Sequence, residues 1–110
     1  MINLPKKGSS RARAAAEWSE DSSGAVIKRL LDDPSGYRTM QMKVEPGPLG
    51  EAHSHAEVEQ VYVLEGDFFD EQGSYAAGDL VVRAAGAMHR SGSANGCTML
   101  LIYTPAMPGR

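Results

Sequence analysis

The sequence predicts an all-β domain, and three features lead to that class. From Gly24 onward, short runs rich in β-branched residues are separated by turn residues, mainly glycine, proline and aspartate. The run 37–45 alternates cleanly, with Met40, Met42 and Val44 on one face and polar residues on the other. No stretch shows the apolar period of a long helix. About eight short strands suit a double-sheet jelly-roll barrel.

The chain has the size of one domain. Its 110 residues allow a single core that buries roughly two-thirds of the unfolded surface. We assign 1–20 to an N-terminal arm and 21–110 to the barrel. The net charge of −3 gives no indication of a nucleic-acid partner, and no apolar run is long enough to cross a membrane. The single cysteine, Cys97, lies in an apolar run, and we expect a cytoplasmic protein.

The arm is the least patterned part of the chain. Its cations, Lys6, Lys7, Arg11 and Arg13, lie beside glycine and serine, which is typical of a flexible solvated segment. Trp18 is the only tryptophan, and a ring of this size normally packs against other side chains. We expect the arm to be flexible or to pack on its own barrel or on a partner subunit, with neither surface favoured.

The first strands follow from local patterns. We expect a strand at 25–31, a turn at 32–36 that contains proline and glycine, and the alternating strand at 37–45. The two prolines of 46–50 lack backbone N–H groups and should end that strand.

The later strands are bounded by turn residues in the same way. The run 59–66 reads as a strand, and 67–75 reads as a hairpin that turns at 71–73. The run 80–84 is rich in valine, and 97–104 is an apolar stretch that we expect to form the last strand.

The three histidines fall in two short stretches. His53 and His55 are two residues apart, so they share a face if that stretch is extended. Glu59 shares its parity with Val61 and opens the next run. If that run pairs antiparallel with the histidine strand, its carboxylate returns to the imidazoles. Two histidines and a carboxylate form a donor set for a divalent transition metal.

These residues resemble the two motifs of the cupin superfamily. The first motif has glycine, His-x-His, glutamate and glycine at fixed spacing, and every position matches: Gly47, His53, His55, Glu59 and Gly66. The second motif matches at Gly78, Gly86 and His89 but has Ala84 where proline is expected and Ser93 where asparagine is expected. The resemblance covers about residues 24–105. Within the cupins, the chain looks like the ChrR-type branch, which includes the zinc domain of anti-sigma factors and proteins similar to acetylacetone dioxygenase.

The resemblance implies a jelly-roll cupin barrel with one divalent metal, either Fe, Zn, Mn or Ni. Its ligands would be His53, His55, Glu59 and His89, and Met40 and Met42 would line the pocket or simply fill the core. Four protein ligands complete the tetrahedron of a structural zinc site. The same four leave two positions open on an octahedral metal.

Three functions therefore stay open at the sequence level. We favour a metal-dependent enzyme, an Fe(II) dioxygenase of a small dicarbonyl or ketone. The alternative is a non-catalytic zinc-binding sensor similar to ChrR. The third is a barrel whose metal serves folding alone. The resemblance also implies a homodimer that binds a small molecule. From the net charge and the lack of a long apolar run, we expect neither nucleic acid nor membrane as a partner.

Overall fold

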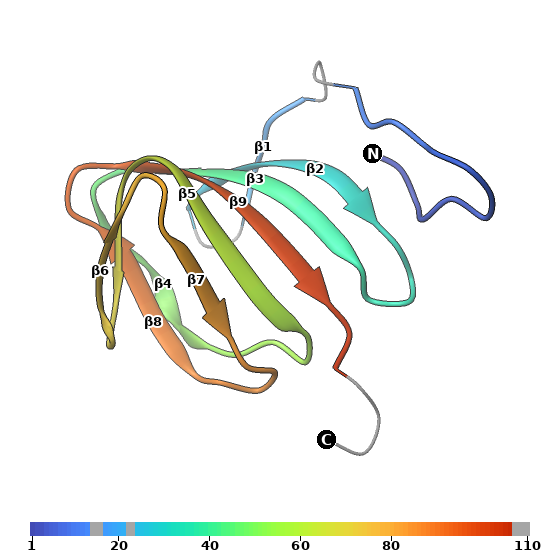
Figure 1. Cartoon of the computed structure of the whole chain (residues 1–110). Helices are drawn as coiled ribbons and strands as arrows, with labels where there is room; N and C mark the ends of the chain where they lie inside the picture. Colours follow the sequence, from blue (N-terminus) through green and yellow to red (C-terminus); the bar gives the residue numbers. More distant parts are fainter. Residues whose placement is uncertain (14–16, 22–23, 107–110) are drawn as a thin grey trace.

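The computed structural model describes residues 1–13, 17–21 and 24–106, except the side chains of 51–53. It confirms the all-β prediction, because the described residues form strands and no helix. The strands curl into an antiparallel half-barrel (Figure 1). The nine strands are β1 Ser19–Glu20, β2 Val26–Asp32, β3 Arg38–Val44, β4 Gly47–His53, β5 Val58–Asp70, β6 Gly73–Ala76, β7 Leu80–Arg83, β8 His89–Ser93 and β9 Cys97–Thr104.

The long strand β5 joins the two halves of the sheet. The strand order is β1-β2-β3-β9-β5-β8-β4, with β6 and β7 also paired to β5. The first part of β5 pairs with β9 on one edge and with β7 on the other. Its last four residues pair with β6, and Phe69 is opposite Gly92 of β8. One strand thus carries the chain from one sheet to the other.

The bend in β5 lies at Gly66. This glycine has φ of +80°, and a Cβ atom added to it would come 2.0 Å from the carbonyl oxygen of Gly96. The ladder to β9 also shifts between Val63 and Glu65. Such an irregularity bends a strand and increases its twist. Only glycine satisfies both the backbone angle and the close approach to the neighbouring turn.

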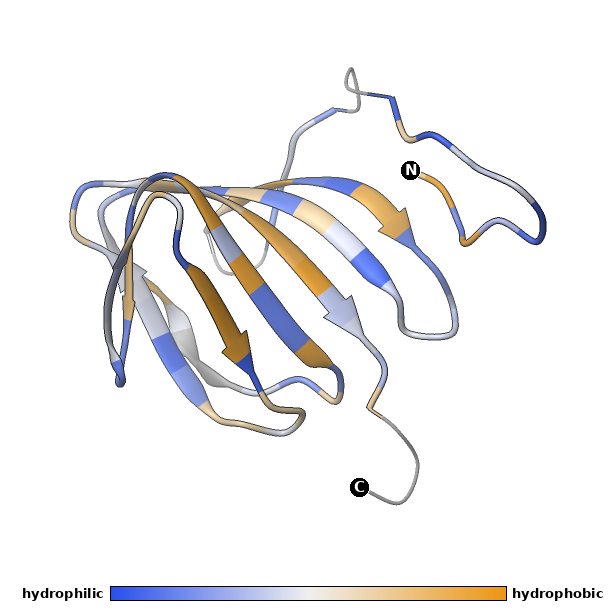
Figure 2. Ribbon diagram, in the orientation of Figure 1, coloured by the Kyte–Doolittle hydropathy of each residue, from blue (hydrophilic) through white to orange (hydrophobic). Residues whose placement is uncertain are grey.

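The interior consists of rows of side chains that run across β3, β9, β5 and β7. One row is Met40, Leu101, Val61 and Val81, which are direct partners in the register and are all buried. The row behind it contains Met42, Met99 and Val63. Figure 2 shows apolar and polar bands in turn along β3 and β5, as expected when one face is buried, whereas β7 is apolar up to Arg83.

One predicted strand pairing is wrong. The 59–66 run does not pair with the histidine strand, because β9 and β7 already occupy both edges of that part of β5. Instead β4 pairs with β8, which brings His53 opposite His89 in the backbone register. Strand β4 also begins earlier than expected, at Gly47, and includes Pro48. A proline is tolerated there because β4 is the last strand in the order.

The described part of the arm contacts the edge of the barrel. The Trp18 ring lies 4.8 Å from Nζ of Lys28 on β2 and 4.5 Å from Nζ of Lys43 on β3. Ile2 forms an isolated parallel bridge with Leu31 of β2. The described residues include no helix with the length and apolar character needed to span a membrane.

Candidate metal centre

A row of polar side chains follows the apolar rows on the inner face. In the register, Arg38 of β3 is opposite Tyr103 of β9, Tyr103 is opposite Glu59 of β5, and Glu59 is opposite Arg83 of β7. Glu59, Arg83 and Tyr103 are at most 9% exposed. Charged groups are rarely buried to this extent unless they are paired, and a buried hydroxyl normally has a hydrogen-bond partner, so each needs a partner.

Both carboxylate oxygens of Glu59 accept a hydrogen bond from a buried donor. Arg83 Nη1 donates to Oε1 at 2.9 Å, and the Tyr103 hydroxyl donates to Oε2 at 2.6 Å. Arg83 Nη2 also donates to Asp70 Oδ2 at 2.8 Å and to Ser91 Oγ at 2.9 Å. The carboxylate of Glu59 is therefore held at two points, and one of the two donors is itself anchored to other strands.

These contacts set the charge of the group. Burial opposes ionisation of Glu59, but the hydrogen bonds from Tyr103 and Arg83 and the positive charge of Arg83 outweigh it and lower its pKa. Burial likewise opposes the charge of Arg83, yet the bonds to Asp70 and Glu59 raise its pKa. Burial and the neighbouring charge of Glu59 raise the pKa of Tyr103. At neutral pH the group thus consists of a carboxylate, a guanidinium and a neutral phenol.

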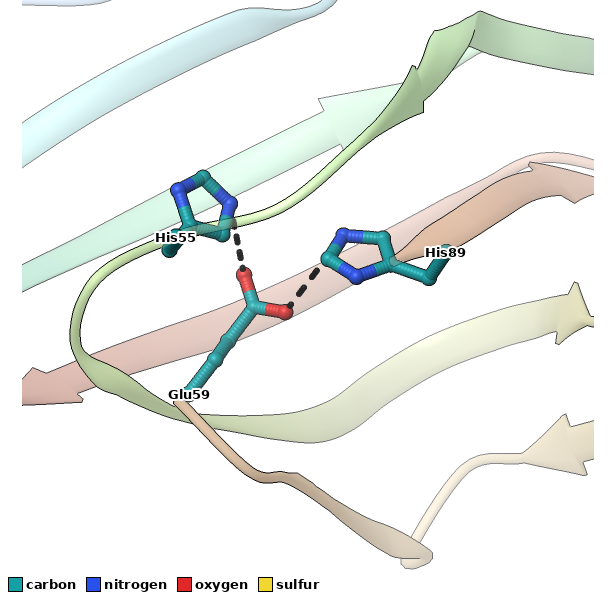
Figure 3. A group of neighbouring side chains, drawn as sticks. All are labelled: His55, Glu59 and His89. Carbon is teal, nitrogen blue, oxygen red and sulfur yellow. Dashed lines mark ion pairs between the residues drawn. The ribbon is translucent and has the colours of Figure 1, made fainter. Parts of the chain in front are cut away.

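Two histidines face this carboxylate from the opposite sheet (Figure 3). His55 lies just after β4, and His89 is the first residue of β8. His55 Nε2 is 3.6 Å from Glu59 Oε2, and His89 Nε2 is 3.9 Å from Glu59 Oε1. The two rings have their centroids 5.7 Å apart. His55, Glu59 and His89 thus meet although they come from three separate segments.

These three residues fit a single metal ion. One potential ligand atom from each lies within 4.8 Å of the other two. Ligand atoms about 2.1 Å from one ion are separated by up to about 4.2 Å, so shifts of a fraction of an ångström bring them into contact with it. Imidazole nitrogen and carboxylate oxygen suit a divalent transition metal, and the donor set alone does not select one.

The fourth predicted ligand, His53, cannot be placed in the same way. Its side chain lies outside the described part of the structure. His53 is the last residue of β4, and its backbone is paired with that of His89. Opposite residues of an antiparallel pair have Cα atoms about 4.5–5.5 Å apart.

His55, Glu59 and His89 line a cavity of about 190 Å³ between the two sheets. One part of its lining is polar and includes His55, Glu59, Arg83, His89, Ser91 and Tyr103. Another part of the lining is apolar and includes both methionines named above, Met40 and Met42, each 8% exposed. Arg38 also lines the cavity, with its guanidinium 4.2 Å from the Tyr103 ring centroid. The cavity is suited to a small molecule with an apolar side.

The two departures from the second motif are compensated locally. Ser93 Oγ donates to the backbone oxygen of Asp67 at 2.7 Å, and Asn95 Nδ2 donates to the Asp67 carboxylate at 2.7 Å. Near Ala84, the loop closes through Ala87 N to Ala84 O at 3.1 Å. Gly86 N then donates to the carbonyl of His55 at 2.7 Å, which ties the second motif to the first.

Arg83 and Tyr103, which belong to this site, were not predicted from the sequence. A signal for each was available in the strand parity. Arg83 has the parity of Val81, and Tyr103 has the parity of Met99 and Leu101, so both are inward-facing polar residues on apolar strands. A buried guanidinium requires a carboxylate partner, which points to Glu59.

Comparisons with known proteins agree with the fold. The family model for the ChrR cupin-like domain matches residues 8–107. No curated protein matches the sequence. Among solved structures, ChrR in complex with SigE of Rhodobacter sphaeroides aligns with a TM-score of 0.71 at 19% identity, over 83% of this chain and 51% of that chain. The chain thus spans about half the length of ChrR.

Two further structures cover most of both chains. An RmlC-like cupin from Shewanella frigidimarina has a TM-score of 0.72 at 20% identity and covers 86% of this chain and 87% of its own. A predicted oxalate decarboxylase from Thermotoga maritima has a TM-score of 0.68 at 22% identity and covers 86% and 98%. At these identities the likeness shows the shared cupin fold. Because the family model matches nearly the whole sequence, the chain belongs to the ChrR cupin-like domain family.

Proposed function

We propose that this protein is a metal-dependent cupin enzyme of the dioxygenase type that acts on a small dicarbonyl or ketone. The observation that carries the proposal is the convergence of His55, Glu59 and His89, from both sheets, in the lining of a cavity of about 190 Å³. We further propose that His53, paired with His89 in the backbone register, supplies a fourth ligand. With four protein ligands, Fe(II), Mn(II) or Ni(II) keeps two open positions.

The residues around the site would bind and orient the substrate. When bound, the metal supplies Lewis acidity toward a carbonyl oxygen. The apolar part of the cavity lining, which includes Met40 and Met42, would accommodate the carbon chain of a ketone and exclude water. Tyr103 and Arg83 hold Glu59 in place while the substrate binds.

Oxygen uptake tests the proposal. Protein without a metal-binding tag is loaded anaerobically with Fe(II) and mixed with a panel of diketones and hydroxyketones. We expect substrate-dependent oxygen consumption by the wild type and none by His89→Ala loaded in the same way. Absence of uptake across the panel by protein that has been shown to contain iron would contradict the enzyme proposal.

The family match favours a second candidate function. The ChrR structure is that of an anti-sigma factor bound to SigE, so we propose zinc-dependent sensing or regulation as the alternative. In that case zinc would be bound inertly with all four ligands, and a specific protein partner would be recovered in a pull-down. A metal that exchanges readily with added chelator would count against this alternative.

We also propose that the protein is a homodimer. The outer face of β5 and β7 exposes a group of apolar side chains that a second copy could cover: Tyr62, Leu64, Leu80 and Val82, which are 37–61% exposed. Tyr62 and Leu80 are direct cross-strand partners, so the group is contiguous. We also propose that the protein binds a small molecule and is located in the cytoplasm.

A further inference from the structure

Arg83 places a positive charge beside a residue that is expected to bind a cation. It is opposite Glu59 in the β5–β7 register, it is 9% exposed, and its Nη1 lies 2.9 Å from Glu59 Oε1. A guanidinium and a divalent cation are both attracted to the same carboxylate and repel each other. We propose that Arg83 is a positioning residue that orients Glu59 and also limits the metal affinity, so that the metal exchanges with solution.

Arg83 has partners other than Glu59. Its Nη2 is held by Asp70 Oδ2 at 2.8 Å and by Ser91 Oγ at 2.9 Å, and its guanidinium lies 5.2 Å from the Phe68 ring centroid. These three partners come from β5 and β8. Arg83 therefore stays beside the carboxylate whether or not a cation is bound there. The repulsion is consequently a fixed property of the site.

Tyr103 provides a natural comparison for Arg83. Its hydroxyl donates to the other oxygen of Glu59 at 2.6 Å, so it also restrains the carboxylate. A phenol brings no positive charge. Loss of Tyr103 should therefore remove part of the restraint and none of the repulsion. Arg83 and Tyr103 together allow orientation and charge to be tested separately.

Asp70 controls how much of the Arg83 charge acts on Glu59. It is buried in the same ion-pair network and shares the guanidinium with Glu59. Without the Asp70 charge, the positive charge of Arg83 is offset by Glu59 alone. Arg83→Gln and Asp70→Asn break the same ion pair, yet they change the charge near Glu59 in opposite directions.

This inference rests on the proposed metal site, and equilibrium metal binding tests it without any measurement of activity. The dissociation constants of Zn²⁺ and Co²⁺ are measured for untagged protein by competition with a chromophoric chelator, and folding is checked by circular dichroism. We expect Arg83→Gln to bind about tenfold more tightly or better and Asp70→Asn to bind about three- to tenfold more weakly. Tyr103→Phe should stay within about threefold of the wild type.

Two further variants test whether the charge of Arg83, and not the shape of its side chain, sets the metal affinity. Arg83→Lys keeps the charge, so its dissociation constant should stay within about threefold of the wild type, while the visible spectrum of bound Co²⁺ changes because the fixed fork is lost. In the Arg83→Gln background, Asp70→Asn should weaken binding less than it does alone, because its effect acts through Arg83.

The outcomes are distinct. If Arg83→Gln and Asp70→Asn both weaken metal binding, Arg83 is only a structural support and the inference is overturned. Unchanged dissociation constants in both variants overturn it as well. If Arg83→Gln does not fold, an Asp70→Asn variant that binds as tightly as the wild type overturns the inference, and weaker binding supports it. A folded wild-type protein that binds no divalent metal would instead overturn the proposed function.

Discussion

Glu59 is a carboxylate at a buried position on a strand whose next inward residues are Val61 and Val63. An ionised group at such a position is unfavourable unless hydrogen bonds and an opposite charge replace its hydration. Arg83 and Tyr103 supply these at 2.9 Å and 2.6 Å. Removal of one partner of a buried ion pair typically costs about 3–5 kcal/mol, because the other partner stays buried and unpaired. The polar row is therefore both part of the candidate site and a point where substitutions should strongly affect stability.

Asp70 gives this network a pH dependence. Burial would raise its pKa, but hydrogen bonds from Arg83, the Gln72 amide and Tyr75 outweigh burial and lower it. A carboxyl group whose pKa is lower in the folded state stabilises the fold above its unfolded pKa of about 3.9, and this contribution is lost as the pH falls through the folded pKa.

We therefore expect Asp70→Asn to lower the free energy of unfolding at pH 7 by about 2 kcal/mol or more. The difference from the wild type should shrink as the pH falls from 5 toward 3, as measured by thermal unfolding. A difference that stays constant over this range would show that Asp70 does not act through its charge. Glu65→Gln, on the exposed part of β5, is the matched control and should have little effect at either pH.

Cys97 should be unreactive in the native protein. It is 6% exposed in the core, and burial and the charge of Asp67 raise its pKa to about 11. Since the thiolate is the reactive form, we expect native protein to react with a disulfide reagent at pH 8 at least about a hundredfold more slowly than unfolded protein. The absorbance of the released thiol measures both rates. Equal rates would mean that the thiol is accessible.

At the scale of elements, β5 determines where the site lies. Its first residues carry Glu59 and its last residues carry Asp70, and both bind the same arginine of β7. The strand can serve both sheets because it bends at Gly66, close to the turn at Gly96. Asp67, just after the bend, accepts hydrogen bonds from the amides of Ala94 and Asn95 at 2.7 and 3.2 Å. The bend is thus fixed to the turn that leads into β9.

Gly66→Ala should disrupt this arrangement. The new methyl group would meet a backbone oxygen, and the residue would keep a positive φ. We expect a loss of about 3 kcal/mol or more in the free energy of unfolding, measured in urea. Gly78→Ala is the control, since Gly78 also has a positive φ of +94° but an added Cβ atom would meet nothing within 4 Å, and it should cost about 1 kcal/mol. Equal losses would contradict the packing argument.

The strands could be predicted from the sequence, but their pairing could not. Alternation predicted the strands and the inward direction of Glu59, because parity is a local property of the chain. The pairing of β4 with β8 depends on contacts between residues far apart in sequence. The predicted antiparallel pairing of the 59–66 run with the histidine strand was therefore wrong. Arg83 and Tyr103 were missed because the motifs contain neither residue, although their parity placed them inside.

For the whole molecule, the candidate site requires both sheets. His55 and His89 come from the β4–β8 side, whereas Glu59, Arg83 and Tyr103 come from the β5, β7 and β9 side. A cation held by all three ligands would link the two sheets and would stabilise the folded state in proportion to its binding. Chelation should therefore lower the melting temperature if metal is bound. This effect is also expected if the metal serves folding alone.

The exposed apolar face predicts the behaviour of the molecule in solution. We expect wild-type protein to have the mass of a dimer in light scattering after gel filtration. The double variant Leu80→Lys and Val82→Lys should be a monomer, because it places two charges in the interface. Arg90→Ala, at an exposed position of β8, is the control and should stay dimeric. A monomeric wild type, or a double variant that is still dimeric, would contradict the proposed interface.

Above all, we expect His55, Glu59 and His89 to bind one divalent cation between the two sheets. Elemental analysis of untagged protein, after incubation with metal and removal of the excess, measures this most directly. We expect about one transition-metal ion per chain in the wild type and less than about one-tenth in the double variant His55→Ala and His89→Ala with its fold retained. An equal metal content in the two proteins would contradict the account.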